Sequence, residues 1–386
     1  MNRYRIHCLP GLLLVGALYF GAPVLAATPT PAAAPGAAEA AQPKTEAAQP
    51  RTEAEFIPSF RYGDRVLTED TVWKGVVLVE GAVTIAPQAT LTIEPGTVLR
   101  FRGKEPSGAV LVVQGRLAAA GTKESPIVFT SSFAVPAAGD WQGVMLLGSE
   151  KRNVLENCRI DAAQTGLEAI FSNLTLKSVR AERSKTGMRF QDALVVMEGG
   201  GASDCDTGLN FSESEATLRN LNLIGNRKGL VAQRSSIYMQ EGSLSMNGSA
   251  FSCDSCRVRL QGGAVSDNAR GITLYESEGA VTGVQVARNS DYGISLTASR
   301  IRVTANQMTG NGNSGLLVFD GSSVAWDNAI HDNGYDVYNA GKEEFRAPGN
   351  WWGAAGPKIY DNGGAGKVIF TPRLTAPPEA GSKEKP

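Results

Sequence analysis

A unit of the form glycine, apolar residue, any residue, apolar residue recurs along most of the chain. Successive copies lie 23, 21, 21, 21, 21, 21, 22 and 22 residues apart. Such a constant interval indicates a repeat architecture in which each unit builds one structural layer. The nine copies begin at Gly143, Gly166, Gly187, Gly208, Gly229, Ala250, Gly271, Gly293 and Gly315.

Each interval contains two further short segments in which apolar and polar residues alternate. The second segment has apolar pairs at Leu174/Leu176, Val195/Met197, Ala216/Leu218, Ile237/Met239, Val258/Leu260 and Ile301/Val303. The third has single apolar positions at Leu223, Leu244, Val265, Val286 and Met308. Alternation with period two is typical of strands, so three strands per ~21 residues predict one triangular coil. We therefore expect an all-β, single-stranded parallel β-helix of about a dozen coils, right-handed because parallel crossovers almost always are.

Asparagines recur between the third strand and the next glycine unit, with spacings of 21, 21, 21, 22 and 22 residues. Stacked asparagines tolerate a strained turn and can hydrogen-bond to the coils above and below. Extrapolation by 21 residues upstream reaches Cys205 and then Ser184, so we expect the amide ladder to stop there. Its predicted members are Asn226, Asn247, Asn268, Asn289, Asn311 and Asn333.

The segments outside the repeat suggest an exported protein. Residues 1–26 have a positively charged start, an apolar stretch and a small-residue cleavage site ending at Ala26, as in a secretory signal peptide. Residues 27–55 form an Ala/Pro-rich linker expected to be disordered, because it lacks apolar periodicity. We assign 56–376 to the β-helix with its terminal caps and 377–386 to a disordered tail. No transmembrane segment then remains, and periplasmic, outer-surface and extracellular locations stay open.

The amino-acid composition limits which partners and metal sites are possible. Glycine is frequent, at 44 of 386 residues, as many tight turns require, and the chain has only two histidines. Signal removal would leave His331 as the last histidine, for which we expect a turn role. A net charge of -1 gives no basic footprint for nucleic acid. A single histidine also cannot form a histidine-rich metal site, so we exclude that kind of site.

Two stretches outside the counted repeats carry a family resemblance. The N-terminal one reads VLVEGAVTIAPQATLTIEPGTVLRF, and the C-terminal one contains NWWGAAGP at 350–357 and VIFTPRL at 368–374. With the coils between them, they resemble the bacterial secreted right-handed β-helix proteins of the pectin-lyase-like superfamily. The resemblance implies an exported, sugar-associated setting. In its lyase and hydrolase members, it also implies acidic or basic residues clustered outward over adjacent coils.

The outward position of the glycine unit does not carry such a cluster. Its residues are Met145, Glu168, Arg189, Asn210, Val231, Ser252, Thr273, Ser295 and Leu317. Glu168 and Arg189 are weak catalytic candidates, and Asp204 and Asp206 are weak binding candidates on neighbouring turns. Calcium is conceivable beside these aspartates but unsupported, since Ca²⁺ takes six to eight oxygens. We expect no cofactor.

Two further pairs invite a functional reading. Trp351 and Trp352 could stack on sugar rings, although end caps of the solenoid are the favoured interpretation. Cys253 and Cys256 are a disulfide candidate in an exported protein, with a buried Cys253 thiol nearly as well supported.

The sequence therefore favours an exported, non-catalytic scaffold or binding protein for polysaccharide or cell-envelope components, and a monomer. A polysaccharide lyase, hydrolase or epimerase with an unrecognised site is the alternative, followed by an accessory role in periplasmic assembly.

Overall fold

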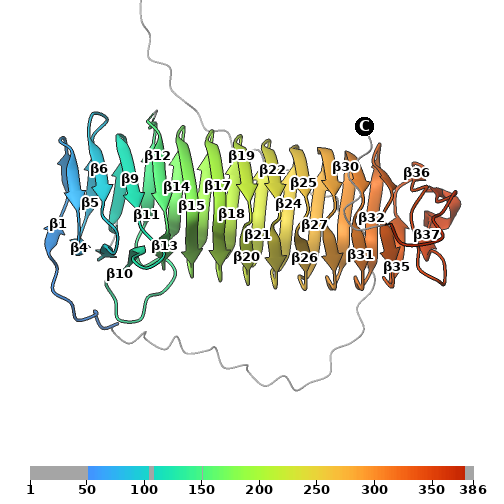
Figure 1. Ribbon diagram of the computed structural model, residues 1–386, viewed down its shortest axis with the longest axis horizontal. Coiled ribbons are helices and arrows are strands. Elements are labelled where there is room, and N and C mark those ends of the chain that lie inside the picture. Colours follow the sequence, from blue (N-terminus) through green and yellow to red (C-terminus); the bar gives the residue numbers. More distant parts are fainter. Residues whose placement is uncertain (1–50, 104–107, 150, 379–386) are drawn as a thin grey trace, which may run out of the picture. The chain divides into compact units, whose positions relative to one another are not determined.

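The computed structural model describes residues 51–103, 108–149 and 151–378. Parallel strands stack coil on coil along one axis, in about 15 coils (Figure 1). The expectation of about a dozen coils is close; the additional coils lie before Gly143 and after Gly315, where the glycine unit does not recur. Among the described residues the one helical element is η1 (Asn362–Gly364), a short 3-10 turn.

Each coil contributes one strand to each of three faces, which we call the first, second and third sheets in chain order. The first sheet, built from the glycine units, contains β2 (Arg65–Leu67), β5 (Ala82–Ile85), β8 (Val110–Val113), β11 (Gly143–Leu147), β14 (Thr165–Ile170), β16 (Thr186–Gln191), β18 (Thr207–Ser212), β21 (Lys228–Gln233), β24 (Ser249–Asp254), β27 (Arg270–Tyr275), the first part of β30 (Tyr292–Thr304), β32 (Ser314–Gly321), β35 (Tyr335–Asn339) and β37 (Ile359–Tyr360).

The second sheet follows across the first corner. It contains β3 (Thr71–Trp73), β6 (Thr90–Ile93), β9 (Arg116–Ala120), β12 (Asn153–Glu156), the first parts of β15 (Asn173–Glu182) and β17 (Leu194–Ser203), β19 (Glu215–Arg219), β22 (Ser236–Gln240), β25 (Arg257–Gln261), β28 (Glu278–Thr282), the last part of β30, β33 (Val324–Trp326), β36 (Phe345–Arg346) and β38 (Val368–Ile369).

The third sheet closes each coil. It contains β1 (Phe60–Tyr62), β4 (Val76–Val79), β7 (Val98–Phe101), β10 (Ile127–Ser131), β13 (Cys158–Asp161), the last parts of β15 and β17, β20 (Asn222–Ile224), β23 (Ser243–Ser245), β26 (Ala264–Ser266), β29 (Gln285–Ala287), β31 (Gln307–Thr309) and β34 (Ala329–His331).

The predicted apolar positions form the interior of the solenoid. Val258, Leu260, Ile301 and Val303 are at most 1% exposed and belong to one continuous core. Eight of the nine units begin with glycine because stacked backbones approach closely there: a Cβ at Gly229 would lie 2.5 Å from the carbonyl oxygen of Ala250 on the next coil. This spacing explains why the first sheet repeats a glycine, because few larger residues fit between stacked backbones.

Single residues in the left-handed conformation turn the chain at the corners, as at Arg234, Glu241 and Met246 in one coil. The amide ladder is present as predicted. Asn268 Nδ2 donates to Asn289 Oδ1 at 3.0 Å, and Asn268 Oδ1 accepts from Asn247 Nδ2 at 3.0 Å. The ladder also stops where expected, since the Cys205 amide donates to Asn226 Oδ1 at 3.0 Å and no asparagine precedes it on that corner of the described chain.

Two other ladders were not expected. Asn306, Asn328 and Asn350 stack on a second corner, with Nδ2 to Oδ1 distances of 2.9 and 2.8 Å. Serines occupy the first corner, where Ser277 Oγ accepts from the Cys256 amide and the Ser277 amide donates to Ser299 Oγ, both at 3.1 Å. The serine series has a weaker signal in the sequence, because serine also occurs at many positions outside this corner.

The N-terminal side of the domain carries an additional segment. Residues 51–55, which we assigned to the linker, lie against the end of β10: the Ala54 amide donates to Ser132 O and the Ala134 amide to Thr52 O, at 2.8 and 2.9 Å. Contacts with the β-helix thus begin before residue 56. The proposed signal peptide, most of the linker and residues 379–386 lie outside the described residues. In the part of the chain that is described, no helix is long and apolar enough to cross a membrane.

Candidate binding face

The sequence-derived catalytic candidates lie together on the first sheet but neutralise each other. Glu168 on β14 and Arg189 on β16 are register neighbours, and Arg189 NH1 lies 3.2 Å from Glu168 Oε1. Asp206 instead faces Arg227 at 3.8 Å, while Asp204 is an exposed left-handed corner residue. The four residues therefore form separate ion pairs and corners rather than one convergent site.

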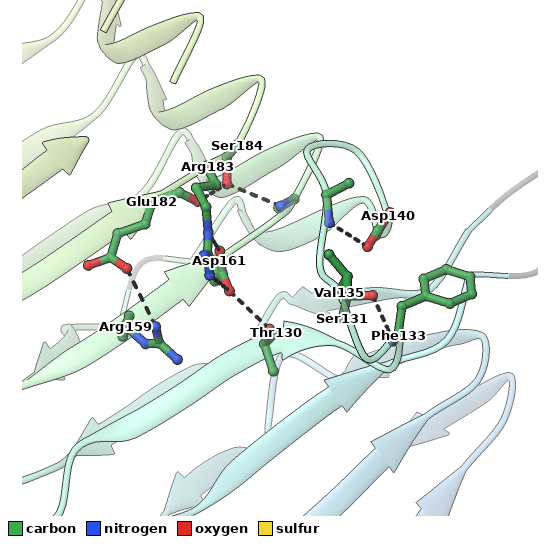
Figure 2. Close-up of polar contacts among 12 residues, drawn as sticks. Thr130, Ser131, Phe133, Val135, Asp140, Arg159, Asp161, Glu182, Arg183 and Ser184 are labelled. Carbon is green, nitrogen blue, oxygen red and sulfur yellow. Dashed lines mark hydrogen bonds and ion pairs between the residues drawn. The ribbon is translucent and has the colours of Figure 1, made fainter. Parts of the chain in front are cut away.

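A denser polar cluster surrounds the corner after β13 (Figure 2). Asp161 is almost fully buried and accepts from Arg183 Nε at 3.0 Å, Arg183 NH2 at 2.7 Å and Thr130 Oγ1 at 3.2 Å. This bidentate pairing raises the pKa of Arg183 further above its usual value. Both carboxylate oxygens of Asp161 are occupied by protein donors, so the cluster ties adjacent coils together.

The aromatic candidates divide at the C-terminal end. Trp352 is 3% exposed and belongs to the core, as a cap requires. Trp351 is half-buried against His331, with ring centroids 4.8 Å apart. His331 Nδ1 in turn lies 2.6 Å from Asp332 Oδ2. At the N-terminal end Trp73 is fully buried.

The candidate disulfide between Cys253 and Cys256 is not formed, and all four cysteines of the described chain are buried thiols. Cys253 points into the core from β24. Cys256 takes a place in the serine ladder, where its Sγ lies 3.3 Å from Asp254 O, in the way that Ser235 Oγ donates to Gln233 O. A contact with Cys253 lowers the Cys256 pKa, whereas burial raises the Cys253 pKa. The spacing of the two cysteines suggested a disulfide, but the Cys253 thiol packs in the core and the Cys256 thiol occupies a position of the serine ladder.

A concentration of positive charge lies on the outside of the second sheet. Strands β25, β28, β30, β33 and β36 contain five arginines and one glutamate, a net of four positive charges. We call the outward side of these strands the arginine face. Its charged residues are Arg257, Arg259, Glu278, Arg300, Arg302 and Arg346.

Two columns of side chains run along this face. In the first, Glu278 lies between Arg257 and Arg300, at 3.0 and 3.1 Å from their guanidinium nitrogens. These two contacts hold the pKa of Glu278 below its usual value, so it stays ionised. In the second column, Arg302 and Arg346 have no hydrogen-bond or ion-pair partner among the described residues.

Aromatic and amide side chains flank the arginines. Arg259 lies over the Tyr238 ring, 5.6 Å from its centroid, and Tyr238 Oη is 3.3 Å from the amide oxygens of Gln240 and Gln261. Trp326 stands half-buried on β33 beside Val324. Guanidinium, amide and aromatic groups on one open surface are suited to bind a polar polymer that also has apolar patches.

A groove of about 640 Å³ borders the arginine face at the corner between the first and second sheets. Its walls span several coils and are mainly serine and charged residues. The lining residues shared with the arginine face are Arg257, Glu278 and Arg300. A linear ligand could therefore lie along the coil axis without folding.

The sequence did contain the signal for this face. Arg259, Arg302 and Arg346 lie 43 and 44 residues apart, which is two repeats each time. They occupy the outward position of the second strand of each repeat, and the outward position of the glycine unit lies on a different sheet. No group of three or more His, Cys, Asp or Glu side chains that could hold a metal lies within the described ranges.

Two family models match this chain. Residues 65–174 match a pectate-lyase-like β-helix domain, and residues 207–364 match a right-handed β-helix region. The chain belongs to the pectate-lyase-like, right-handed parallel β-helix proteins.

No curated protein matches the chain. Among solved structures, a double mutant of a periplasmic alginate epimerase is 15% identical with a TM-score of 0.46, covering 79% of this chain and 78% of that one. The A-module of an Azotobacter vinelandii mannuronan C-5 epimerase is 13% identical with a TM-score of 0.34, covering 78% of this chain and 89% of that one. A lacto-N-biosidase from Eubacterium ramulus is 11% identical with a TM-score of 0.33, covering 74% of this chain and 62% of that one.

Proposed function

We propose that this protein is an exported, non-catalytic binding protein for an acidic polysaccharide, which lies lengthwise on the arginine face. The observation that carries the proposal is the column of arginines on the second sheet without acidic partners among the described residues. A guanidinium binds a carboxylate or sulfate through two parallel hydrogen bonds, and these are stronger than bonds between neutral groups.

The ionisable groups elsewhere support binding rather than turnover. A glycoside hydrolase needs two carboxylates on opposite sides of the scissile bond. Glu168 is paired with Arg189, and Glu278 is held ionised by two arginines, which makes it a poor proton donor. The signal-like residues 1–26 support an exported location.

Titration of the purified full-length chain with acidic and neutral polysaccharides tests this function. We expect Arg302→Ala to weaken binding of the acidic polymer about tenfold, because a charged hydrogen bond contributes about 1.5–3 kcal/mol and this one is exposed. Binding should also weaken with added salt.

Arg180→Ala is the matched control, since Arg180 is an exposed arginine on the third-sheet part of β15. It should bind as the unaltered chain does. Product analysis of the same samples by reducing ends and by absorbance of unsaturated sugars checks for turnover. Equal binding by Arg302→Ala and the unaltered chain, or turnover of the polymer, would rule out this function.

A further inference from the structure

The arginine column repeats every second coil. The register runs from Arg259 through Ala280 to Arg302, and on through Val324 to Arg346. Neighbouring parallel strands lie about 4.8 Å apart, so successive arginines stand about 10 Å apart along the coil axis. The column thus alternates between a cation and a small apolar residue.

Elsewhere this protein pairs many of its charges between adjacent coils. Arg288 binds Asp267 at 2.7 Å, and the Arg257–Glu278–Arg300 series places an acid between two arginines. In the arginine column the intervening positions, where such an acid would stand, hold Ala280 and Val324. Among the described residues no acid completes this column, so we assign that role to anions from outside the chain.

The column also has defined ends. On the N-terminal side Arg259 is followed by Tyr238, whose ring the guanidinium covers. On the C-terminal side Arg346 is followed by Ile369. Between these limits the site spans five coils and three arginines.

Resting on the proposed function, we propose that the ligand is a linear heteropolysaccharide in which an acidic sugar alternates with a neutral one. A hexose in an extended chain advances by about as much as one coil. Each acidic group then meets Arg259, Arg302 or Arg346, and each neutral sugar covers Ala280 or Val324.

The apolar positions discriminate against an acid on every sugar. A carboxylate above Ala280 or Val324 would lose water without gaining a hydrogen bond, which is unfavourable. A neutral sugar can instead lay its C–H face on Val324 and on the ring of Trp326, two residues further along β33. Five sugars with three acidic groups fill the site.

Three probes of equal length test the inference on the full chain: hyaluronan fragments, in which acidic and neutral sugars alternate; polymannuronate, with an acid on every sugar; and neutral dextran. We expect hyaluronan to bind about tenfold more tightly than polymannuronate, and dextran not to bind.

A variant with Ala280→Arg and Val324→Arg would place a cation on every coil. Both positions are outward and half-buried, so the added arginines can extend into solvent. We expect this variant to lose the preference for hyaluronan and to gain affinity for polymannuronate. Circular dichroism and thermal melting verify that the double variant folds. If it does not fold, Arg302→Ala is tested instead. In that variant the remaining arginines of the column lie four coils apart, so the preference for hyaluronan should be lost.

The two levels of the hypothesis fail differently. Tight binding of both acidic polymers without preference, or a preference that survives in both variants, overturns the alternating ligand and leaves the proposed function intact. If the protein binds neither hyaluronan nor polymannuronate, the proposed function itself is overturned.

Discussion

At the scale of single residues, the corners of the coils impose the strictest requirements. At each corner a left-handed residue turns the chain, and a ladder residue directly after it, such as Asn247 after Met246, satisfies backbone groups that the stack has buried. Asparagine does this in two ladders and serine in a third, and Cys205 and Cys256 take ladder positions as well. Residue type at a corner is therefore set by hydrogen bonding as much as by backbone shape.

Removal of one ladder member tests this role. Asn268 bridges Asn247 and Asn289 and also donates to the carbonyls of Leu244 and Ser266. We expect Asn268→Ala to lower the free energy of unfolding by about 3 kcal/mol, because several buried polar groups lose their partner. Asn210→Ala, at an outward position of β18, should change it by less than about 0.5 kcal/mol. Urea denaturation measures both, and equal values would contradict a structural ladder.

The thiols provide a second prediction at this scale. Burial raises the pKa of Cys158 to about 12 and that of Cys205 to about 11, while the Cys253 contact lowers the pKa of Cys256. Since the thiolate is the reactive form, Cys256 should be alkylated first at pH 8, and the others only as the pH approaches their raised values. Peptide mass spectrometry after brief exposure to iodoacetamide measures the order. Alkylation of Cys158 as fast as Cys256 would contradict the assigned environments.

At the scale of elements, one rule places every strand: alternate residues enter the core. The strands and their inward sides followed from apolar spacing because a shift of one residue would expose the whole apolar set. The loop at 132–142 and the contacts of residues 51–55 could not be predicted from apolar spacing. They depend on particular long-range pairs, such as Arg51 with Asp140, which have no periodic signal.

A charge on the inward side of one strand tests the register. Val258 on β25 and Ile301 on β30 are at most 1% exposed. Val258→Asp or Ile301→Asp should unfold the surrounding coils, since each buries a carboxylate without a partner. Ser252→Asp, outward on β24, should leave circular dichroism and the melting temperature nearly unchanged. An unaltered melting curve for both inward variants would contradict the register.

At the scale of the whole domain, the fold could be predicted from the sequence more readily than the arginine face. The core is specified many times over, since every coil repeats the same apolar positions. The arginine face depends on three residues in separate coils, which become one column only when the register is known. Glu168 and Arg189 were adjacent as expected, but adjacency produced mutual neutralisation.

The two-coil period of the arginine column has a consequence for how the domain can change in evolution. The fold tolerates gain or loss of any whole coil, because each coil contacts only its neighbours. A single inserted coil within the column would nevertheless put the arginines out of phase with the alternating polymer that we propose as the ligand, whereas a duplicated pair of coils would lengthen the site by one acidic and one neutral sugar. If the proposed ligand is right, we expect coils to be gained or lost singly elsewhere in the solenoid, and in pairs within the arginine column.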